Sequence, residues 1–68
     1  MEFDPSDTDG WYDKARSNAK LNDVNNALSD LRKAIELGGE DYKTKAKNEK
    51  DFDNIRTDVR FKEMIDNE

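Results

Sequence analysis

Small residues recur at helical spacing in the first half of the chain and limit what it can fold into. Ala15 lies four residues after Trp11, and a second apolar stripe follows a short polar break. The members of this second stripe are Ala27, Leu31 and Ala34. Two helices approach to about 8–10 Å only where the facing side chains are short, and an aromatic side chain can fill the space beside them. The pattern therefore predicts a closely packed pair of helices.

Polar residues and glycines at the ends of these stripes supply helix boundaries. Asp7 or Thr8 can cap a first helix, and Asn22 tolerates the left-handed turn that would end it. Asp23 can cap the second helix, and the glycine pair at 38–39 follows its last apolar residues, as expected for a helix C-terminus. Each boundary residue thus agrees with the apolar spacing.

These positions resemble the tetratricopeptide repeat, a helix–turn–helix unit of about 34 residues with the signature W-x2-L-G-x2-Y, then A-x3-F, then Pro. The residues that match in type and spacing are Trp11, Ala15, Ala27, Leu31 and Ala34. Departures from the signature occur at Lys14, Asn18 and Gly39. Pro5 lies one repeat length before Gly39, as though residues 1–7 ended a preceding repeat. The resemblance covers about half the chain and implies a helical hairpin at about residues 8–37.

The second half of the chain is less regular. Tyr42 and Ala46 repeat the spacing of Trp11 and Ala15, and Asp41 can cap a short helix near 41–48. The segment at 51–66 is similar to the endings of tetratricopeptide arrays, which cover the apolar face of the last repeat. Its apolar residues are expected on the open edge of the hairpin and are Phe52, Ile55, Val59, Phe61, Met64 and Ile65. The expected helix caps in this segment are Asp51 and Thr57 or Asp58.

Length and composition restrict the fold to one thinly cored unit. A domain of 68 residues buries only about 60% of its unfolded surface. Val, Ile, Leu and Phe together number 12, a share below the roughly 20% at which charged chains begin to resemble disordered ones. The periodic apolar positions and a net charge of only −5 argue for folding, and without cysteine no disulfide can support it. We expect an all-α domain over residues 1–68, a hairpin plus one or two short C-terminal helices.

Charge and hydropathy exclude several classes of partner. The sequence pI is near 4.7, and Lys and Arg alternate with Asp and Glu, so nucleic acid is not an expected partner. No apolar run reaches the length of a signal peptide or a membrane span, so a membrane is not expected either. A cytoplasmic protein is the default, although an organelle-targeting segment removed earlier would leave no trace.

The residues that usually carry catalysis are scarce. The chain has no His and no Cys, and it lacks the G-x-S-x-G motif of hydrolases. Asp51 and Asp53 could do acid–base work only if burial separated their pKa values. They also begin like a calcium loop, but Ile55, Arg56 and Lys62 stand where an oxygen ligand, Gly and Glu are required. We therefore predict no enzyme, no cofactor and no metal site.

The resemblance implies a surface for a protein or peptide partner, because the first helix of each tetratricopeptide repeat lines a groove. That face carries Tyr12, Arg16 and Lys20 here. Arg16 and Lys20 lie one turn apart and could meet a carboxylate, while Tyr12 offers flat contact area. Ordinary surface pairing, as between Asp13 and Arg16, explains the same charges. The carboxylate clamp of some family members is doubtful, because Tyr12 and Arg16 replace its Lys and Asn.

Two further alternatives stay open from the sequence. Trp11 can be a contact residue or a core residue, and its register with Ala15 favours packing against the second helix. The whole chain can also be purely structural, as the end cap of a longer repeat array or as a self-associating helical unit without a ligand of its own.

Overall fold

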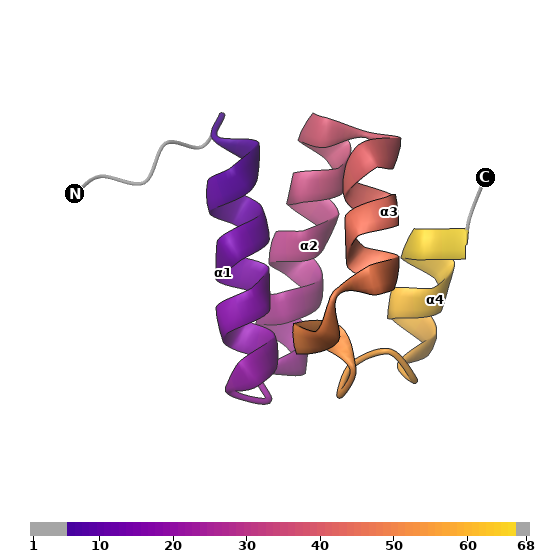
Figure 1. Ribbon diagram of the computed structural model, residues 1–68. Coiled ribbons are helices and arrows are strands. Elements are labelled where there is room, and N and C mark those ends of the chain that lie inside the picture. Colours follow the sequence, from indigo (N-terminus) through magenta and orange to yellow (C-terminus); the bar gives the residue numbers. More distant parts are fainter. Residues whose placement is uncertain (1–5, 67–68) are drawn as a thin grey trace.

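The part of the chain that the structure describes folds into four α-helices, which alternate in direction (Figure 1). The structure, a computed structural model, describes residues 6–66. The helices are α1 (Thr8–Lys20), α2 (Val24–Gly38), α3 (Glu40–Asn48) and α4 (Val59–Asp66), with a 3-10 turn, η1 (Lys50–Phe52), after α3. No strand occurs among these residues. The expected all-α class is confirmed, and the predicted helix at 41–48 corresponds to α3.

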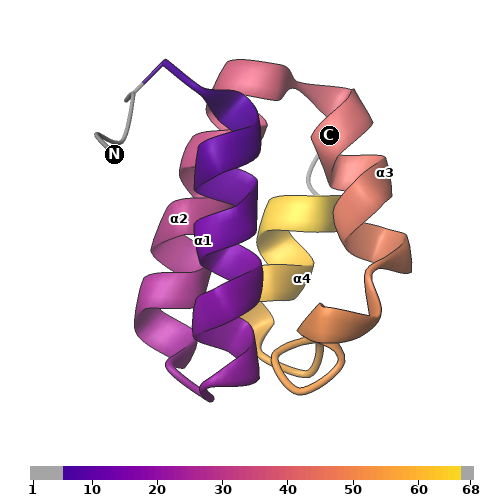
Figure 2. The same ribbon diagram turned by 60° about the vertical axis from the view of Figure 1, so that its left-hand side comes forward.

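α1 and α2 are antiparallel neighbours along their whole length (Figures 1 and 2). Ala15 and Ala19 of α1 and Ala27 and Ala34 of α2 are fully buried. Short side chains at the interface allow the two backbones to approach closely. The predicted hairpin at 8–37 therefore corresponds to α1 and α2, and its membership of the tetratricopeptide family stays a prediction.

Helix boundaries follow from local backbone chemistry. Asn22 has a φ of 65° in the turn after α1, and the Asp23 side chain accepts a hydrogen bond from the Asn26 backbone N–H at 3.4 Å. Gly39, with φ 74° and ψ −150°, separates α2 from α3 in a conformation that essentially only glycine adopts. The prediction that Asp41 caps α3 is wrong. α3 begins at Glu40 with Gly39 as its N-cap, so Asp41 lies inside the first turn.

α1 presents a different aromatic residue to the core from the one expected. Tyr12 is only 6% exposed, whereas Trp11 is partly buried at the margin of the core. The Tyr12 ring packs edge-on against Tyr42, with centroids 5.5 Å apart, and against Phe52 at 5.6 Å. Because α3 and η1 form a third layer beside α1, the side of α1 that carries Tyr12 is covered. The expectation that Tyr12 lies on an exposed face is wrong.

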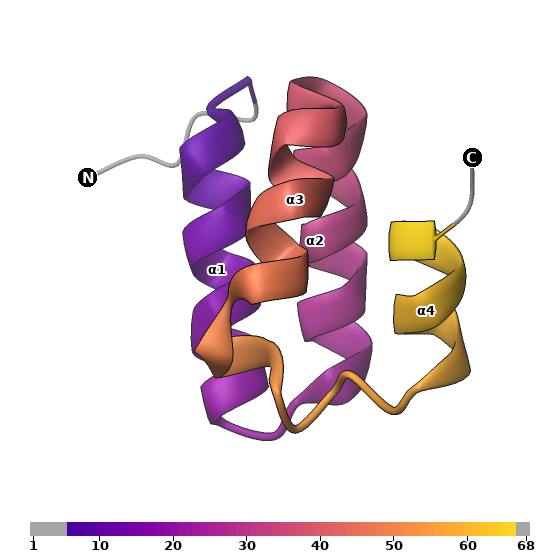
Figure 3. The ribbon, with the colours of Figure 1, turned by 45° about the vertical axis from the view of Figure 1, so that its right-hand side comes forward.

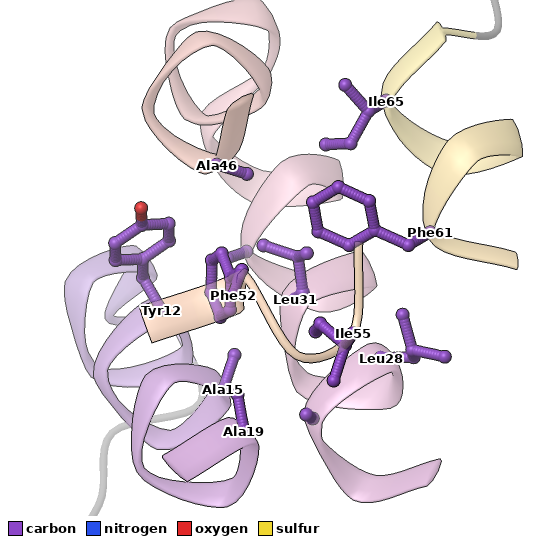
Figure 4. Close-up of a cluster of buried hydrophobic side chains, with 12 residues drawn as sticks. Tyr12, Ala15, Ala19, Leu28, Leu31, Ala46, Phe52, Ile55, Phe61 and Ile65 are labelled. Carbon is purple, nitrogen blue, oxygen red and sulfur yellow. The ribbon is translucent and has the colours of Figure 1, made fainter. Parts of the chain in front are cut away.

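The C-terminal segment covers the open edge of the hairpin, as predicted, with one exception. Phe52, Ile55, Phe61 and Ile65 are buried in one cluster with the hairpin residues, and Figure 4 shows Phe52 between Tyr12 and Leu31. Val59 is 65% exposed. Val59 lies two residues before Phe61, about 200° around the helix. Because Phe61 and Ile65 point into the core, the Val59 side chain points into solvent.

The loop between η1 and α4 is fastened by side-chain hydrogen bonds to helix ends. Asn54 Nδ2 donates to the Ala19 carbonyl of α1 at 2.6 Å. Arg56 donates to the carbonyls of Ala46, Lys47 and Glu49 at the end of α3. Figure 3 shows η1 reaching across from the end of α3 toward α1. The loop therefore satisfies carbonyl groups that helices leave unpaired at their C-termini.

The expected caps of the C-terminal segment have separate outcomes. The Asp58 carboxylate accepts from the Arg60 backbone N–H at 2.8 Å, which makes it the cap of α4. Asp51 lies inside the first turn of η1, so the prediction that it caps a helix is wrong. Its carboxylate is instead 3.0 Å from Arg16 Nε on α1.

The close packing of α1 against α2 can be tested by larger side chains at their interface. We expect Ala15→Leu or Ala27→Leu to lower the free energy of unfolding by about 1–3 kcal/mol, because the extra carbons have no space between the helices. Urea denaturation followed by circular dichroism measures the change. Ser17→Leu, at an exposed position of α1, is the matched control, and equal stability of all three variants would contradict a close-packed interface.

Candidate functional site

A groove of about 450 Å³ opens between α1 and α3. Its lining comes from both helices and from the residue that follows α3: Asp9, Tyr12, Asp13, Arg16, Lys45, Asn48 and Glu49. Two of the three residues predicted for partner binding, Tyr12 and Arg16, belong to this lining, and Lys20 does not. Both helices that form the walls are anchored in the core by fully buried alanines, Ala15 and Ala46.

Arg16 and Lys20, which were predicted to bind a partner, face carboxylates of this chain itself. Arg16 Nε lies 3.0 Å from Asp51 Oδ2 and 3.5 Å from Glu49 Oε1, and Lys20 Nζ lies 4.0 Å from Asp51 Oδ1. The hydrogen bond to Asp51 raises the pKa of Arg16 above its usual value. The structure thus brings Arg16 and Lys20 together on a carboxylate, as their spacing predicted, but that carboxylate is Asp51. Asp51 immediately precedes the fully buried Phe52, so it is held in place.

Tyr12 forms the wall of the groove nearest the core, and Tyr42 packs against Tyr12 outside the groove lining. The Tyr12 hydroxyl donates to Glu49 Oε1 at 3.4 Å, and the Tyr42 hydroxyl donates to the Asp9 carboxylate. The Tyr42 ring lies against Gly38, where a Cβ atom would collide with the ring. Lys45 Nζ sits 4.6 Å from the centroid of the Tyr42 ring, within the range of a cation–π interaction.

Both tyrosines are expected to titrate late. Burial and then the Glu49 charge raise the pKa of Tyr12 to about 12, and the hydrogen bond to Asp9 and then burial raise the pKa of Tyr42 to about 12. The unfolded chain loses these protons near pH 10, so this stabilisation is complete below pH 10 and is lost as the pH rises toward 12. Ultraviolet absorbance of tyrosinate measures both titrations. The same chain in denaturant is the control, and folded-state titration near pH 10 would contradict these contacts.

The groove has an excess of negative charge. Asp9, Asp13 and Glu49 line it against Arg16 and Lys45, and Arg16 is already paired with Asp51. The Asp13 side chain is mostly exposed and faces Arg16 only at 3.5 Å. A ligand that enters between the two helices therefore meets carboxylates and the small exposed part of Tyr12.

A second groove, of about 510 Å³, lies between α2 and α4. Its lining is Asn25, Leu28, Ser29, Arg32, Arg60, Glu63 and Met64. Sequence reasoning missed it because α4 was expected only as a cover for the hairpin. Leu28, Ser29 and Arg32 lie three, four and seven residues after Asn25, which places all four on one side of a helix. This spacing is the signal that could have found the α2 wall of the groove.

Asp51 and Asp53, the two acidic residues considered for acid–base chemistry, form separate ion pairs. Asp51 pairs with Arg16 on α1, whereas Asp53 lies 3.1 Å from Arg56 Nε in its own loop. The part of the chain that the structure describes contains no cluster of three or more residues able to hold a metal ion. Within residues 6–66 no helix has the length and apolar content needed to cross a bilayer.

Comparison with protein-family models, with curated proteins and with solved structures found no match to this chain. The fold and the two grooves are therefore interpreted from this chain's own residues.

Proposed function

We propose that this chain is a non-catalytic interaction module of tetratricopeptide type that binds a segment of another protein in the groove between α1 and α3. The observation that carries the proposal is the convergence of Tyr12 and of charged side chains from two helices on one open groove. Rigid helices are suited to presenting such a surface, because little conformational freedom is lost on binding.

The chemistry of the groove favours a partner segment with a lysine or arginine side chain. Asp13 offers a largely exposed carboxylate. Lys45 Nζ lies 5.9 Å from the centroid of the Tyr12 ring, which illustrates a cation held beside this wall. Arg16 is paired with Asp51, so its proposed role is to shape the groove. Lys20, which lies 4.0 Å from the same carboxylate, is outside the groove lining. A specific interface usually buries about 800 Å² on each partner, and a groove of this size supports weak binding.

Selection from a displayed library of random linear peptides tests the proposal. We expect enriched peptides to carry Lys or Arg and to bind Asp13→Lys about tenfold more weakly than the unchanged chain, a loss of about 1.4 kcal/mol. Glu36→Lys is the matched control, because Glu36 is exposed on α2 and lines neither groove. Enriched peptides without basic residues, or equal weakening by both variants, would contradict the assigned groove.

A structural role is the second candidate, and exposed apolar side chains favour it. Leu21 is 77% exposed, and Leu37 and Val59 are also open to solvent. If a second copy or a neighbouring repeat covers them, the chain acts as an end cap or a self-associating unit. Sedimentation velocity at two protein concentrations separates the possibilities, because a stable monomer at both would remove self-association.

A further inference from the structure

The groove between α2 and α4 has an apolar floor and a basic rim. Leu28 is buried in the core and Met64 packs against it, and both side chains also line the groove. Arg32 on α2 and Arg60 on α4 line the same groove with a single acidic residue, Glu63. The charged lining of this groove has two cations and one anion, whereas that of the α1/α3 groove has two cations and three anions. Outside the lining, Glu36 and Asp58 pair with Arg32 and Arg60.

Arg60 is held in one orientation by neighbouring side chains. Its Nε and Nη2 donate to the two Asp58 oxygens at 3.1 and 3.0 Å, and its Nη1 donates to Asn25 Oδ1 at 2.8 Å. A guanidinium has five N–H groups, so two remain that these bonds do not use. A fixed guanidinium loses little conformational freedom when it binds a carboxylate.

Arg32 is the adjustable cation of the rim. Its side chain is 75% exposed, and its Nε lies 4.0 Å from Glu36 Oε1. This separation exceeds hydrogen-bond length, and exposed ion pairs of this kind contribute little to stability. Arg32 can therefore turn toward a ligand without loss of a strong internal contact.

We propose that the α2/α4 groove is a second docking surface, whose occupant is an acidic segment of another protein with a leucine-like side chain. The apolar side chain contacts Leu28 and Met64, and carboxylates of the segment bind Arg32 and the unused N–H groups of Arg60. Guanidinium N–H groups are donors only, so the two arginines of the lining select an occupant with carboxylates over a basic one. The proposal does not depend on the α1/α3 groove, which lies between different helices and favours basic ligands.

The probe is a short synthetic peptide with leucines and glutamates on one helical face, blocked at both ends. Two matched peptides replace every glutamate by lysine or every leucine by serine. Methyl NMR spectra of the full chain follow Leu28 and Met64. We expect their signals to shift with the leucine–glutamate peptide and to stay unchanged with the other two.

Two variants at adjacent positions of α2 locate the binding. Arg32→Glu and Lys33→Glu make the same change in net charge, but Lys33 does not line the groove. We expect Arg32→Glu to lower the affinity for the leucine–glutamate peptide about tenfold. Lys33→Glu is expected to lower this affinity less than about twofold, through the long-range effect of its charge. Arg60→Lys keeps the charge but removes the forked donor geometry, and it is also expected to weaken binding.

Three results would overturn the proposal. Equal binding of the lysine peptide would remove the charge preference, and equal weakening by Arg32→Glu and Lys33→Glu would remove the local contact. Shifts of Leu28 and Met64 on concentration of the protein alone would identify a second copy as the occupant. Circular dichroism of each variant confirms that it is folded. Failure of basic peptides to bind would contradict only the proposal for the α1/α3 groove. Failure of that proposal and failure of the α2/α4 proposal are therefore distinguishable.

Discussion

Replacing Phe52 with alanine is expected to unfold most of the molecules at room temperature. The Phe52 side chain is fully buried, and its ring centroid lies 5.6 Å from that of Tyr12 and 6.0 Å from that of Phe61. A buried Phe→Ala change costs about 3–5 kcal/mol. A core in a chain of this length rarely supplies more than about 3–5 kcal/mol in total, so the cost is comparable to the whole stability.

Circular dichroism during thermal and urea unfolding measures this effect. Val59→Ala is the control, because Val59 is a large apolar residue of the same segment that faces solvent, and its loss should change stability by no more than about 0.5 kcal/mol. Phe52→Leu should recover part of the stability by refilling some of the cavity. A cooperative transition of Phe52→Ala close to that of the unchanged chain would mean that η1 does not belong to the core.

The two ends of α2 were predictable because local sequence decides them. Asn22 adopts a positive φ, Asp23 caps α2, and Gly39 ends it, each through its own backbone preference. The buried alanines were predictable for a related reason, because residues three and four apart share one face of a helix. These features need no knowledge of what lies beyond the hairpin.

Contacts between distant segments decided the rest. Whether Trp11 or Tyr12 enters the core depends on where η1 packs, and the sequence near α1 contains no information on that. The Arg16–Asp51 contact joins residues 35 positions apart, and with 17 acidic residues the sequence offers many equivalent partners for Arg16. Two of the residues chosen from the sequence, Tyr12 and Arg16, therefore line the α1/α3 groove, but the acidic character of this groove could not be foreseen.

Replacing Arg56 with methionine is expected to lower the free energy of unfolding by about 2–3 kcal/mol. Arg56 Nη1 donates to the carbonyls of Ala46 and Lys47 at 3.3 and 2.5 Å, and Nη2 donates to the Glu49 carbonyl. Hydrogen bonds with a charged partner contribute about 1.5–3 kcal/mol each when shielded from water, and partial exposure of Arg56 lowers their sum. Its guanidinium carbon also lies 5.7 Å from the centroid of the Phe61 ring, so one side chain joins α3, the loop and α4.

Melting temperatures of three variants distinguish this role from a general effect of charge. A loss of 2 kcal/mol corresponds to a decrease of about 8–16 °C in a domain of this size. Arg56→Lys should recover only a small part, because an ammonium cannot direct donors to three carbonyls as a planar guanidinium can. Arg32→Met removes the same charge from a largely exposed position, where a change within about 0.5 kcal/mol is expected. If Arg56→Met and Arg32→Met had the same melting temperature, the C-terminus of α3 would be stabilised by water and by its own turn rather than by Arg56.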